Sequence, residues 1–152
     1  LGDFIAKMKN TRVWDNCLII LVADHGSPFP DFSQYLEPAK YKIPMLWLGG
    51  ALKKDSVVSK YGSQSDIAIT LLNQLGIAGE NYVLGKDILS PASGSFAFYS
   101  FREGMAMMSD STQFGLDFIS GKRLFSSGPV TEKDQFYAKA MQQYIYNYYL
   151  RL

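Results

Sequence analysis

Hydrophobic and polar positions along the chain repeat with helical spacing at both ends and form short apolar or strand-like stretches between them. Near the start, Leu1, Phe4, Ile5 and Met8 recur at the spacing of one helix face. No capping residue precedes this pattern, and the chain begins with leucine rather than methionine. We therefore expect a piece of a longer protein that opens with an amphipathic helix.

Two short apolar runs follow this helix. Residues 18–23 are uninterrupted aliphatics that stop at Asp24 and His25, a pattern typical of a strand buried on both faces of a parallel sheet. Residues 43–48, with a proline near the start and a glycine pair after the end, predict a second strand. The connection, residues 27–42, is rich in proline and aromatic residues, so we expect a loop over the Asp24–His25 end rather than a regular helix.

A second amphipathic helix is predicted from the segment that begins at Ser63. A hydroxyl residue followed three positions later by Asp66 is the pattern of a capping box, and apolar residues continue on one face up to Leu75. Gly76 supplies the stop. This helix is expected to pack on the sheet, and we interpret Asp66 as a cap rather than a metal ligand.

The remainder of the chain changes character and is expected to form a smaller antiparallel meander and a closing helix. Ser120-Gly121 has the composition of a tight hairpin turn, and Thr131 can cap a helix that runs to the end of the chain. An apolar or aromatic residue at every fourth position is expected to face the sheet. The predicted strands are residues 96–101, 105–108, 113–119 and 122–125. The residues expected to face the sheet are Phe136, Ala140, Tyr144 and Tyr148, with Met141 and Ile145 beside them.

These elements predict an α/β fold with a mostly parallel buried sheet covered by helices, plus a small C-terminal antiparallel sheet and a terminal helix. The whole chain, residues 1–152, is expected to be a single fragment of one domain. Within it, residues 1–89 form the α/β part, residues 90–130 the meander and residues 131–152 the helix. Strand edges left open in such a fragment could pair between chains and form an oligomer.

Composition and charge exclude several classes of protein. The 152 residues are 47% hydrophobic and 19% charged, which predicts a globular domain. A net charge of +1 without a basic stripe argues against nucleic acid as a partner. No apolar run approaches the roughly 20 residues that span a bilayer, so this chain carries no predicted membrane segment. The single cysteine, Cys17, excludes an internal disulfide and is interpreted as a packed hydrophobe.

The chemistry is expected at Asp24 and His25, because ligands of α/β sheets bind at the carboxyl ends of strands. A carboxylate oxygen and an imidazole nitrogen on adjacent residues form a plausible half of a metal site, and Gly26 lets the backbone turn sharply after them. A catalytic metal needs three or more protein ligands, which one aspartate and one histidine do not supply. The alternative is a strand-end turn in which the carboxylate only accepts backbone N–H bonds.

Four further polar residues could have a functional role, but each is better explained as a structural or surface residue. Ser27 could be a nucleophile, but a serine before proline is a common turn residue and no second histidine is present to activate it. Lys40 and Lys42 could contact an anionic substrate, yet lysines beside a strand are usually solvated. Arg102 could bind an anion, but a lone arginine near a strand is usually a surface residue.

Several motifs in this order resemble the C-terminal part of the alkaline phosphatase and sulfatase superfamily, nearest to its lipoteichoic-acid-synthase-like, phosphoglycerol transferase branch. The resemblance is densest over residues 1–89. The motifs are Ala23-Asp24-His25-Gly26, Lys42-Ile43-Pro44-Met45, Ser63-Gln64-Ser65-Asp66-Ile67-Ala68-Ile69-Thr70-Leu71-Leu72 and Leu75-Gly76-Ile77.

The resemblance implies an alkaline-phosphatase-like α/β sandwich in which a divalent metal activates a nucleophile toward a phosphate or sulfate ester. Asp24 and His25 would be two of the metal ligands, and the nucleophile and the other ligands would come from earlier strands outside this chain. The lack of any histidine after His25 favours one divalent metal, manganese, zinc or magnesium, over a two-metal site. Ser27 departs from relatives that carry an acid or a histidine near that position.

In such relatives, N-terminal transmembrane helices anchor the protein and the catalytic domain lies outside the cytoplasmic membrane. The complete protein is therefore expected at the cell membrane, as a metal-dependent transferase or hydrolase of phosphate or sulfate esters. The fragment alone, lacking a nucleophile, is expected to be inactive. The alternative function is a non-catalytic binding module with a sulfatase-like fold.

Overall fold

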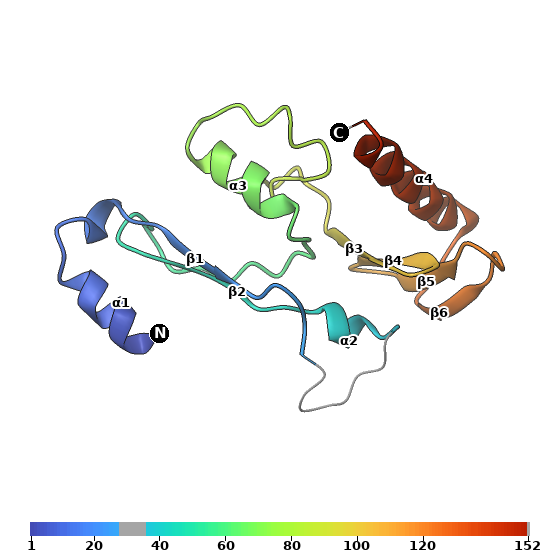
Figure 1. Ribbon diagram of the computed structural model, residues 1–152, viewed down its shortest axis with the longest axis horizontal. Helices are drawn as coiled ribbons and strands as arrows, with labels where there is room; N and C mark the ends of the chain where they lie inside the picture. Colours follow the sequence, from blue (N-terminus) through green and yellow to red (C-terminus); the bar gives the residue numbers. More distant parts are fainter. Residues whose placement is uncertain (28–35, 152) are drawn as a thin grey trace. The chain divides into compact units, whose positions relative to one another are not determined.

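A computed structural model of the chain describes residues 1–27 and 36–151. The chain divides into two compact units, Leu1–Val57 and Val58–Leu152, called unit 1 and unit 2 below. Figure 1 shows the elements of both units along the chain. None of the helices in the described ranges is long and apolar enough to cross a bilayer.

Unit 1 holds a helix and a two-stranded ribbon. The predicted opening helix and both predicted strands are confirmed, each within two residues of its expected bounds. A single helical turn, begun by Pro38, lies inside the connection that was expected to be all loop; residues 28–35 of that connection lie outside the described residues. The elements are α1 (Gly2–Lys9), a 3-10 turn η1 (Trp14–Asn16), β1 (Ile19–Val22), α2 (Pro38–Tyr41) and β2 (Met45–Leu48).

The two strands of unit 1 pair antiparallel, with Ile19 opposite Leu48 and Val22 opposite Met45. The expectation of a mostly parallel sheet is therefore wrong for β1 and β2, the pair of strands in the described part of this unit. An uninterrupted apolar run predicts a strand whose two faces are both buried. It does not predict whether the strand runs parallel or antiparallel to its neighbour, because that depends on which strand it pairs with. Here β2 lies beside β1 and runs in the opposite direction.

The described residues of unit 1 do not bury this ribbon. None of the described residues of unit 1 is buried, although all eight residues of β1 and β2 are apolar. One side-chain atom of the ribbon is nevertheless shielded from solvent. It is the indole nitrogen of Trp47 in β2, whose N–H has no hydrogen-bond partner. The other tryptophan, Trp14, lies in η1 with the Lys9 ammonium 5.9 Å from its ring centre.

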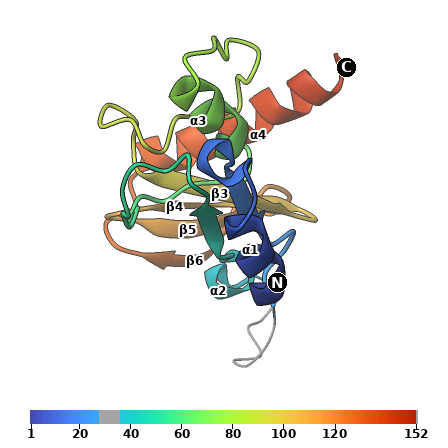
Figure 2. The same ribbon diagram turned by 90° about the vertical axis from the view of Figure 1, so that its left-hand side faces the viewer.

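Unit 2 contains the antiparallel meander and two helices. Its four strands pair in sequence order, as predicted, and Gly121 at φ +68° supports the turn before the last strand. In Figures 1 and 2, α4 lies across one face of this sheet. The elements are α3 (Asp66–Gln74), β3 (Phe96–Phe101), β4 (Gly104–Ser109), β5 (Gln113–Asp117), β6 (Arg123–Ser127) and α4 (Glu132–Tyr149).

The core of the chain lies in unit 2, between the sheet and α4. Phe114 and Leu116 of β5 and Ala138 of α4 form a buried cluster, and Met105 and Ala106 of β4 are fully buried. Apolar residues of two adjacent strands thus supply most of the buried hydrophobic surface, which is the main stabilising term of such a sheet. The α/β class with a small antiparallel sheet and a terminal helix is confirmed.

The face of α4 that packs on the sheet agrees with the predicted one only in part. Ala138 is buried and the predicted Met141, Ile145 and Tyr148 are half-buried, whereas Phe136 and Tyr144 are 67% and 48% exposed. A step of four residues advances about 40° round a helix of 3.6 residues per turn, so a row taken at every fourth residue winds away from the sheet. Steps that alternate three and four residues stay on one face.

The predicted C-terminal end of α3 is confirmed, but its predicted N-cap is wrong. Gly76, at φ +68°, ends α3, and the Ile77 N–H donates to the Leu72 carbonyl across it. Ser63 is not the N-cap of α3, which begins at Asp66. Its hydroxyl instead accepts the Phe98 N–H of β3 at 3.3 Å, so a tertiary contact takes the place of the expected cap.

The N-terminus of α4 has a complete capping box. Thr131 Oγ1 accepts the Asp134 N–H, and the Asp134 carboxylate accepts the Thr131 N–H at 2.8 Å and its hydroxyl at 2.6 Å. The Thr131 hydroxyl, followed by the Thr131 N–H, lowers the pKa of Asp134. The charged carboxylate is therefore the form that stabilises the helix.

We predict that Asp134→Asn removes an acid-sensitive part of the stability. A carboxyl whose pKa is lowered on folding stabilises the protein above its unfolded pKa and ceases to do so as the pH falls through the folded value. The difference in urea stability between wild type and variant should be full near neutral pH and shrink below about pH 4. A constant difference from neutral to acid pH would contradict this role.

Candidate functional site

The two candidate ligands lie just past the end of β1 and are open to solvent. Side-chain exposure is 89% for Asp24 and 81% for His25. The His25 N–H donates to Asp24 Oδ1 at 2.9 Å, which holds the carboxylate beside the ring. The predicted alternative, a carboxylate that accepts a backbone N–H in a strand-end turn, is therefore present in the structure.

The imidazole of His25 is oriented by the next residue. Nδ1 lies 2.9 Å from the carbonyl oxygen of Gly26. A carbonyl only accepts, so Nδ1 carries the proton in this bond and the neutral ring presents an unprotonated Nε2. Metal-binding histidines are commonly fixed in this way, by a bond from the ring nitrogen that does not bind the metal.

His25 Nε2 and Asp24 Oδ1, the oxygen that also accepts the His25 N–H, are close enough to bind one divalent ion together. His25 Nε2 lies 3.7 Å from Asp24 Oδ1. Two donors that each lie about 2.1 Å from one ion are about 3.4 Å apart in tetrahedral coordination, so a shift of a few tenths of an ångström would let both bind. Mixed nitrogen and oxygen ligands suit zinc, manganese or magnesium in differing degree and do not choose among them.

A third ligand is not present in the part of the chain that the structure describes. Across residues 1–27 and 36–151, no group of three or more histidine, cysteine, aspartate or glutamate side chains could hold a metal ion. A metal bound by Asp24 and His25 would therefore need at least one further ligand from elsewhere.

The glycine of the motif is required by a close backbone approach. A Cβ at Gly26 would lie 1.7 Å from the carbonyl oxygen of Lys40, at the end of α2. Gly26 does not have a positive φ, so the glycine is required here by the lack of space for a side chain rather than by its backbone conformation. The expectation that the connection returns over the Asp24–His25 end holds at Lys40, and residues 28–35 lie outside the described residues.

The other candidate residues named from the sequence differ in position and exposure. Ser27 and Lys42 are exposed, and Lys40 is half-buried in α2. Arg102 lies exposed at the turn between β3 and β4, as expected of a surface residue. Cys17 is a free, half-buried cysteine just before β1.

Asp66 is held by an ion pair that the sequence did not reveal. Its side chain is 4% exposed and accepts the Lys86 ammonium at 2.6 Å, the Lys86 N–H at 2.9 Å and the Ser63 N–H at 2.8 Å. Lys86 also donates to the Phe96 carbonyl at 2.7 Å. Protein N–H groups thus donate hydrogen bonds to both oxygens of the carboxylate, in keeping with the structural role predicted for Asp66. Lys86 lies 20 positions away, so no local spacing pointed to it.

The family model described as Sulfatase matches residues 1–77 of this chain. This range contains both candidate ligands and all of α3.

Three curated relatives illustrate the range of similar enzymes. A lipoteichoic acid synthase of Staphylococcus saprophyticus is 26% identical over 94% of this chain and 23% of its own length. A phosphoglycerol transferase I of Xanthomonas axonopodis is 30% identical over 64% of this chain and 14% of its own. An arylsulfatase K of Canis lupus familiaris is 27% identical over 63% and 19%. The chain therefore spans less than a quarter of the length of these relatives.

One solved structure has the same fold over nearly the whole chain. It is a protein of the alkaline phosphatase superfamily from Vibrio parahaemolyticus, with a TM-score of 0.72 and 19% identity. The match covers 99% of this chain and 39% of the solved one.

Proposed function

The chain belongs to the sulfatase family, and from this premise we propose that it is the C-terminal part of a larger sulfatase-like catalytic domain that transfers or hydrolyses phosphate or sulfate esters with the help of one divalent metal. Two of the relatives are named as a lipoteichoic acid synthase and a phosphoglycerol transferase, which favours a phosphoglycerol transferase over a sulfatase. The substrate of the complete protein would then be a phosphate ester.

The observation that carries the proposal is the pair of donor atoms after β1. Nε2 of His25 and Oδ1 of Asp24 lie 3.7 Å apart, with the ring fixed through its other nitrogen. A divalent ion bound by these atoms would lower the pKa of a nucleophile and offset negative charge on the ester oxygens. Its identity, manganese, zinc or magnesium, would depend on the ligands that complete the site.

The residues of this chain have defined tasks in that site. The Gly26 carbonyl holds the His25 ring in one tautomer, and the His25 N–H holds the Asp24 carboxylate beside it. The nucleophile and at least one further ligand would come from the rest of the domain. The isolated chain is therefore expected to show no turnover.

The complete protein is proposed to be anchored in the cell membrane by segments outside this chain, with the catalytic domain on the extracytoplasmic side. This placement follows from the resemblance to lipoteichoic-acid-synthase-like enzymes. It is tested by fractionating cells that produce the complete protein and by protease treatment of intact cells. Loss of the domain on treatment is expected, and full protection would contradict the proposal.

The proposed function is tested with Asp24→Ala and His25→Ala in the complete protein. We expect each variant to lose bound metal and to cleave chromogenic phosphate and sulfate esters roughly 100-fold more slowly than wild type. Asp55→Ala, an exposed acid of the same unit, is the matched control and should retain both properties.

Unchanged metal content and rate in both ligand variants would overturn the proposal. Such a result would favour a non-catalytic binding module with a sulfatase-like fold. Robust turnover by the purified 152-residue chain would contradict the expectation that the nucleophile lies elsewhere.

A further inference from the structure

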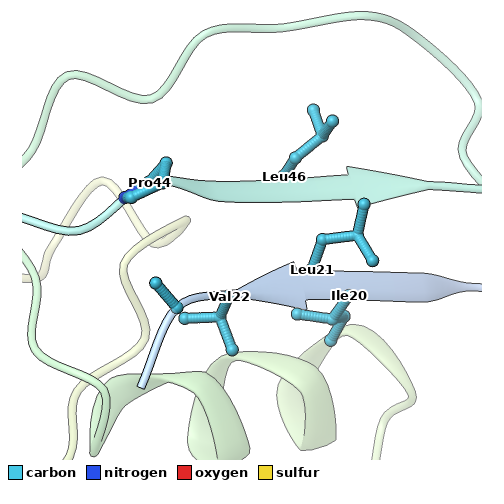
Figure 3. A pocket seen from close by; sticks show the side chains of 6 residues that line it. Ile20, Leu21, Val22, Pro44 and Leu46 are labelled. Atoms are coloured by element: carbon cyan, nitrogen blue, oxygen red, sulfur yellow. The ribbon is translucent and has the colours of Figure 1, made fainter. Parts of the chain in front are cut away.

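A lysine lies beside the candidate metal ligands, on the segment that leads into β2. The register of the ribbon pairs Val22 with Met45. When this register is continued past the strand ends, His25 comes to lie opposite Lys42. Figure 3 shows Val22 and Pro44 at the same end of the ribbon, the end at which β1 stops and β2 begins. The strand pairing thus brings together two residues that are distant in the sequence.

A backbone contact supports the continued register. Gly26 would lie opposite Tyr41, between Lys40 and Lys42. A Cβ at Gly26 would be 1.7 Å from the Lys40 carbonyl oxygen and 3.4 Å from the Lys42 carbonyl oxygen, so both neighbours of Tyr41 flank this glycine. Residues that face each other in an antiparallel pair have Cα atoms about 4.5–5.5 Å apart. The two segments therefore stay side by side as far as Gly26, and the backbone of Lys42 lies next to that of His25.

The backbone of Lys42 is held in place while its side chain is open to solvent. Lys42 is the C-cap of α2, with φ −77° and ψ 119°, and its N–H donates to the Ala39 carbonyl at 3.4 Å. The side chain is exposed, and in the part of the chain that the structure describes it takes part in no ion pair. Because the four-carbon stem of a lysine is flexible, this ammonium can reach an anion bound beside His25.

The proposed reaction needs a positive charge at this position. An ester bound to a metal at Asp24 and His25 would keep negative charge on the non-bridging oxygens that do not bind the metal. A lysine ammonium is a point charge with three donors, and lysines commonly hold phosphate oxygens during group transfer. Composition alone favours a solvated role for a lysine beside a strand, and the position opposite His25 is the observation that changes this interpretation.

We infer that Lys42 is a substrate-binding residue, whose ammonium donates a hydrogen bond to a non-bridging oxygen of the ester bound at Asp24 and His25. The inference rests on the proposed function and deepens it, because it names a residue of this chain that recognises the anionic group of the substrate. Lys42 stays protonated throughout, so it contributes charge and hydrogen bonds and no proton transfer.

Binding of inorganic phosphate to the complete, metal-loaded protein tests the inference. Lys42→Ala should weaken phosphate binding and lower kcat/KM for chromogenic phosphate esters, each roughly 10- to 100-fold, the loss typical of a hydrogen bond to a charged group. The metal content should equal that of the wild type. Lys42→Arg, which keeps the charge, should recover most of the binding. Lys53→Ala, at an exposed lysine of the same unit, is the matched control and should bind phosphate normally.

Chemical labelling supplies a readout that does not depend on activity. The metal-loaded protein is treated with acetic anhydride, and the acetylation of each lysine is followed by mass spectrometry. Saturating phosphate should slow the acetylation of Lys42 and leave that of Lys53 unchanged. Equal labelling of Lys42 with and without phosphate would overturn the inference.

The variants also separate this inference from the proposed function. Wild-type phosphate affinity in Lys42→Ala, together with loss of metal in Asp24→Ala, would overturn the inference alone. Loss of metal in Lys42→Ala would overturn it too, because the lysine would then act on the metal ligands and not on the substrate. Retained metal in both Asp24→Ala and His25→Ala would overturn the proposed function, and the inference with it.

Discussion

Replacing Asp66 with alanine is expected to lower the free energy of unfolding of unit 2 by about 3–5 kcal/mol, the cost of removing one partner of a buried ion pair. The Lys86 side chain is 14% exposed and would keep its positive charge with only the Phe96 carbonyl as a strong acceptor. The Ser63 and Lys86 N–H groups would also lose their acceptor. Urea denaturation of the chain, followed by circular dichroism, measures the effect.

Two further variants test whether the ion pair is the cause. Lys86→Met alone should also destabilise unit 2, because it leaves the Asp66 carboxylate buried without a counter-charge. The double variant Asp66→Ala/Lys86→Met should lose less than the sum of the single losses, since no unpaired charge remains. Lys139→Met, at an exposed lysine of α4, serves as the control and should change the stability by less than about 0.5 kcal/mol. Additive losses in the double variant would refute coupling between the two residues.

Gly26→Ala is expected to weaken metal binding by the complete protein roughly 10- to 100-fold, the effect typical of disturbing a residue that orients a ligand. The added Cβ would lie 1.7 Å from the Lys40 carbonyl oxygen, so either the motif or α2 must move. Any movement of Gly26 displaces the carbonyl that fixes the His25 ring. Titration of the metal-free protein with zinc or manganese measures the change.

The control for this substitution is Gly2→Ala. Nothing lies within 4 Å of a Cβ at Gly2, and this residue is in α1, where alanine is favoured. Gly2→Ala should bind metal as the wild type does. Equal affinities for all three proteins would mean that the motif tolerates the displacement and that the Gly26–Lys40 contact has no role in the site.

Local patterns predicted most elements because their signals lie within a few residues. The spacing from Leu1 to Met8, the stop at Gly76 and the box formed by Thr131 and Asp134 each depend on neighbours in sequence. Asp24 and His25 were found for the same reason, since they directly follow an apolar strand. Any further ligand would come from a distant part of the sequence, where no local pattern points to it.

The errors arose where a distant partner decides the structure. Ser63 was predicted to cap α3, but its hydroxyl bonds to Phe98, 35 positions away. The ion pair of Asp66 and Lys86 likewise joins two segments that share no local pattern. The direction of β2 relative to β1 depends on pairing rather than on composition. Sequence periodicity indicates which secondary structure a segment favours. Contacts with distant residues then decide which hydrogen bonds and strand pairings form.

The distribution of indole rings gives the chain a built-in optical reporter. Both tryptophans, Trp14 and Trp47, belong to unit 1, and unit 2 has none. Selective excitation of tryptophan would therefore read the solvation of the ribbon without any signal from the meander. The Trp47 indole N–H, shielded and without an acceptor, makes its emission colour sensitive to whether water reaches β2. Ordering of the two units can thus be followed separately in one unlabelled sample.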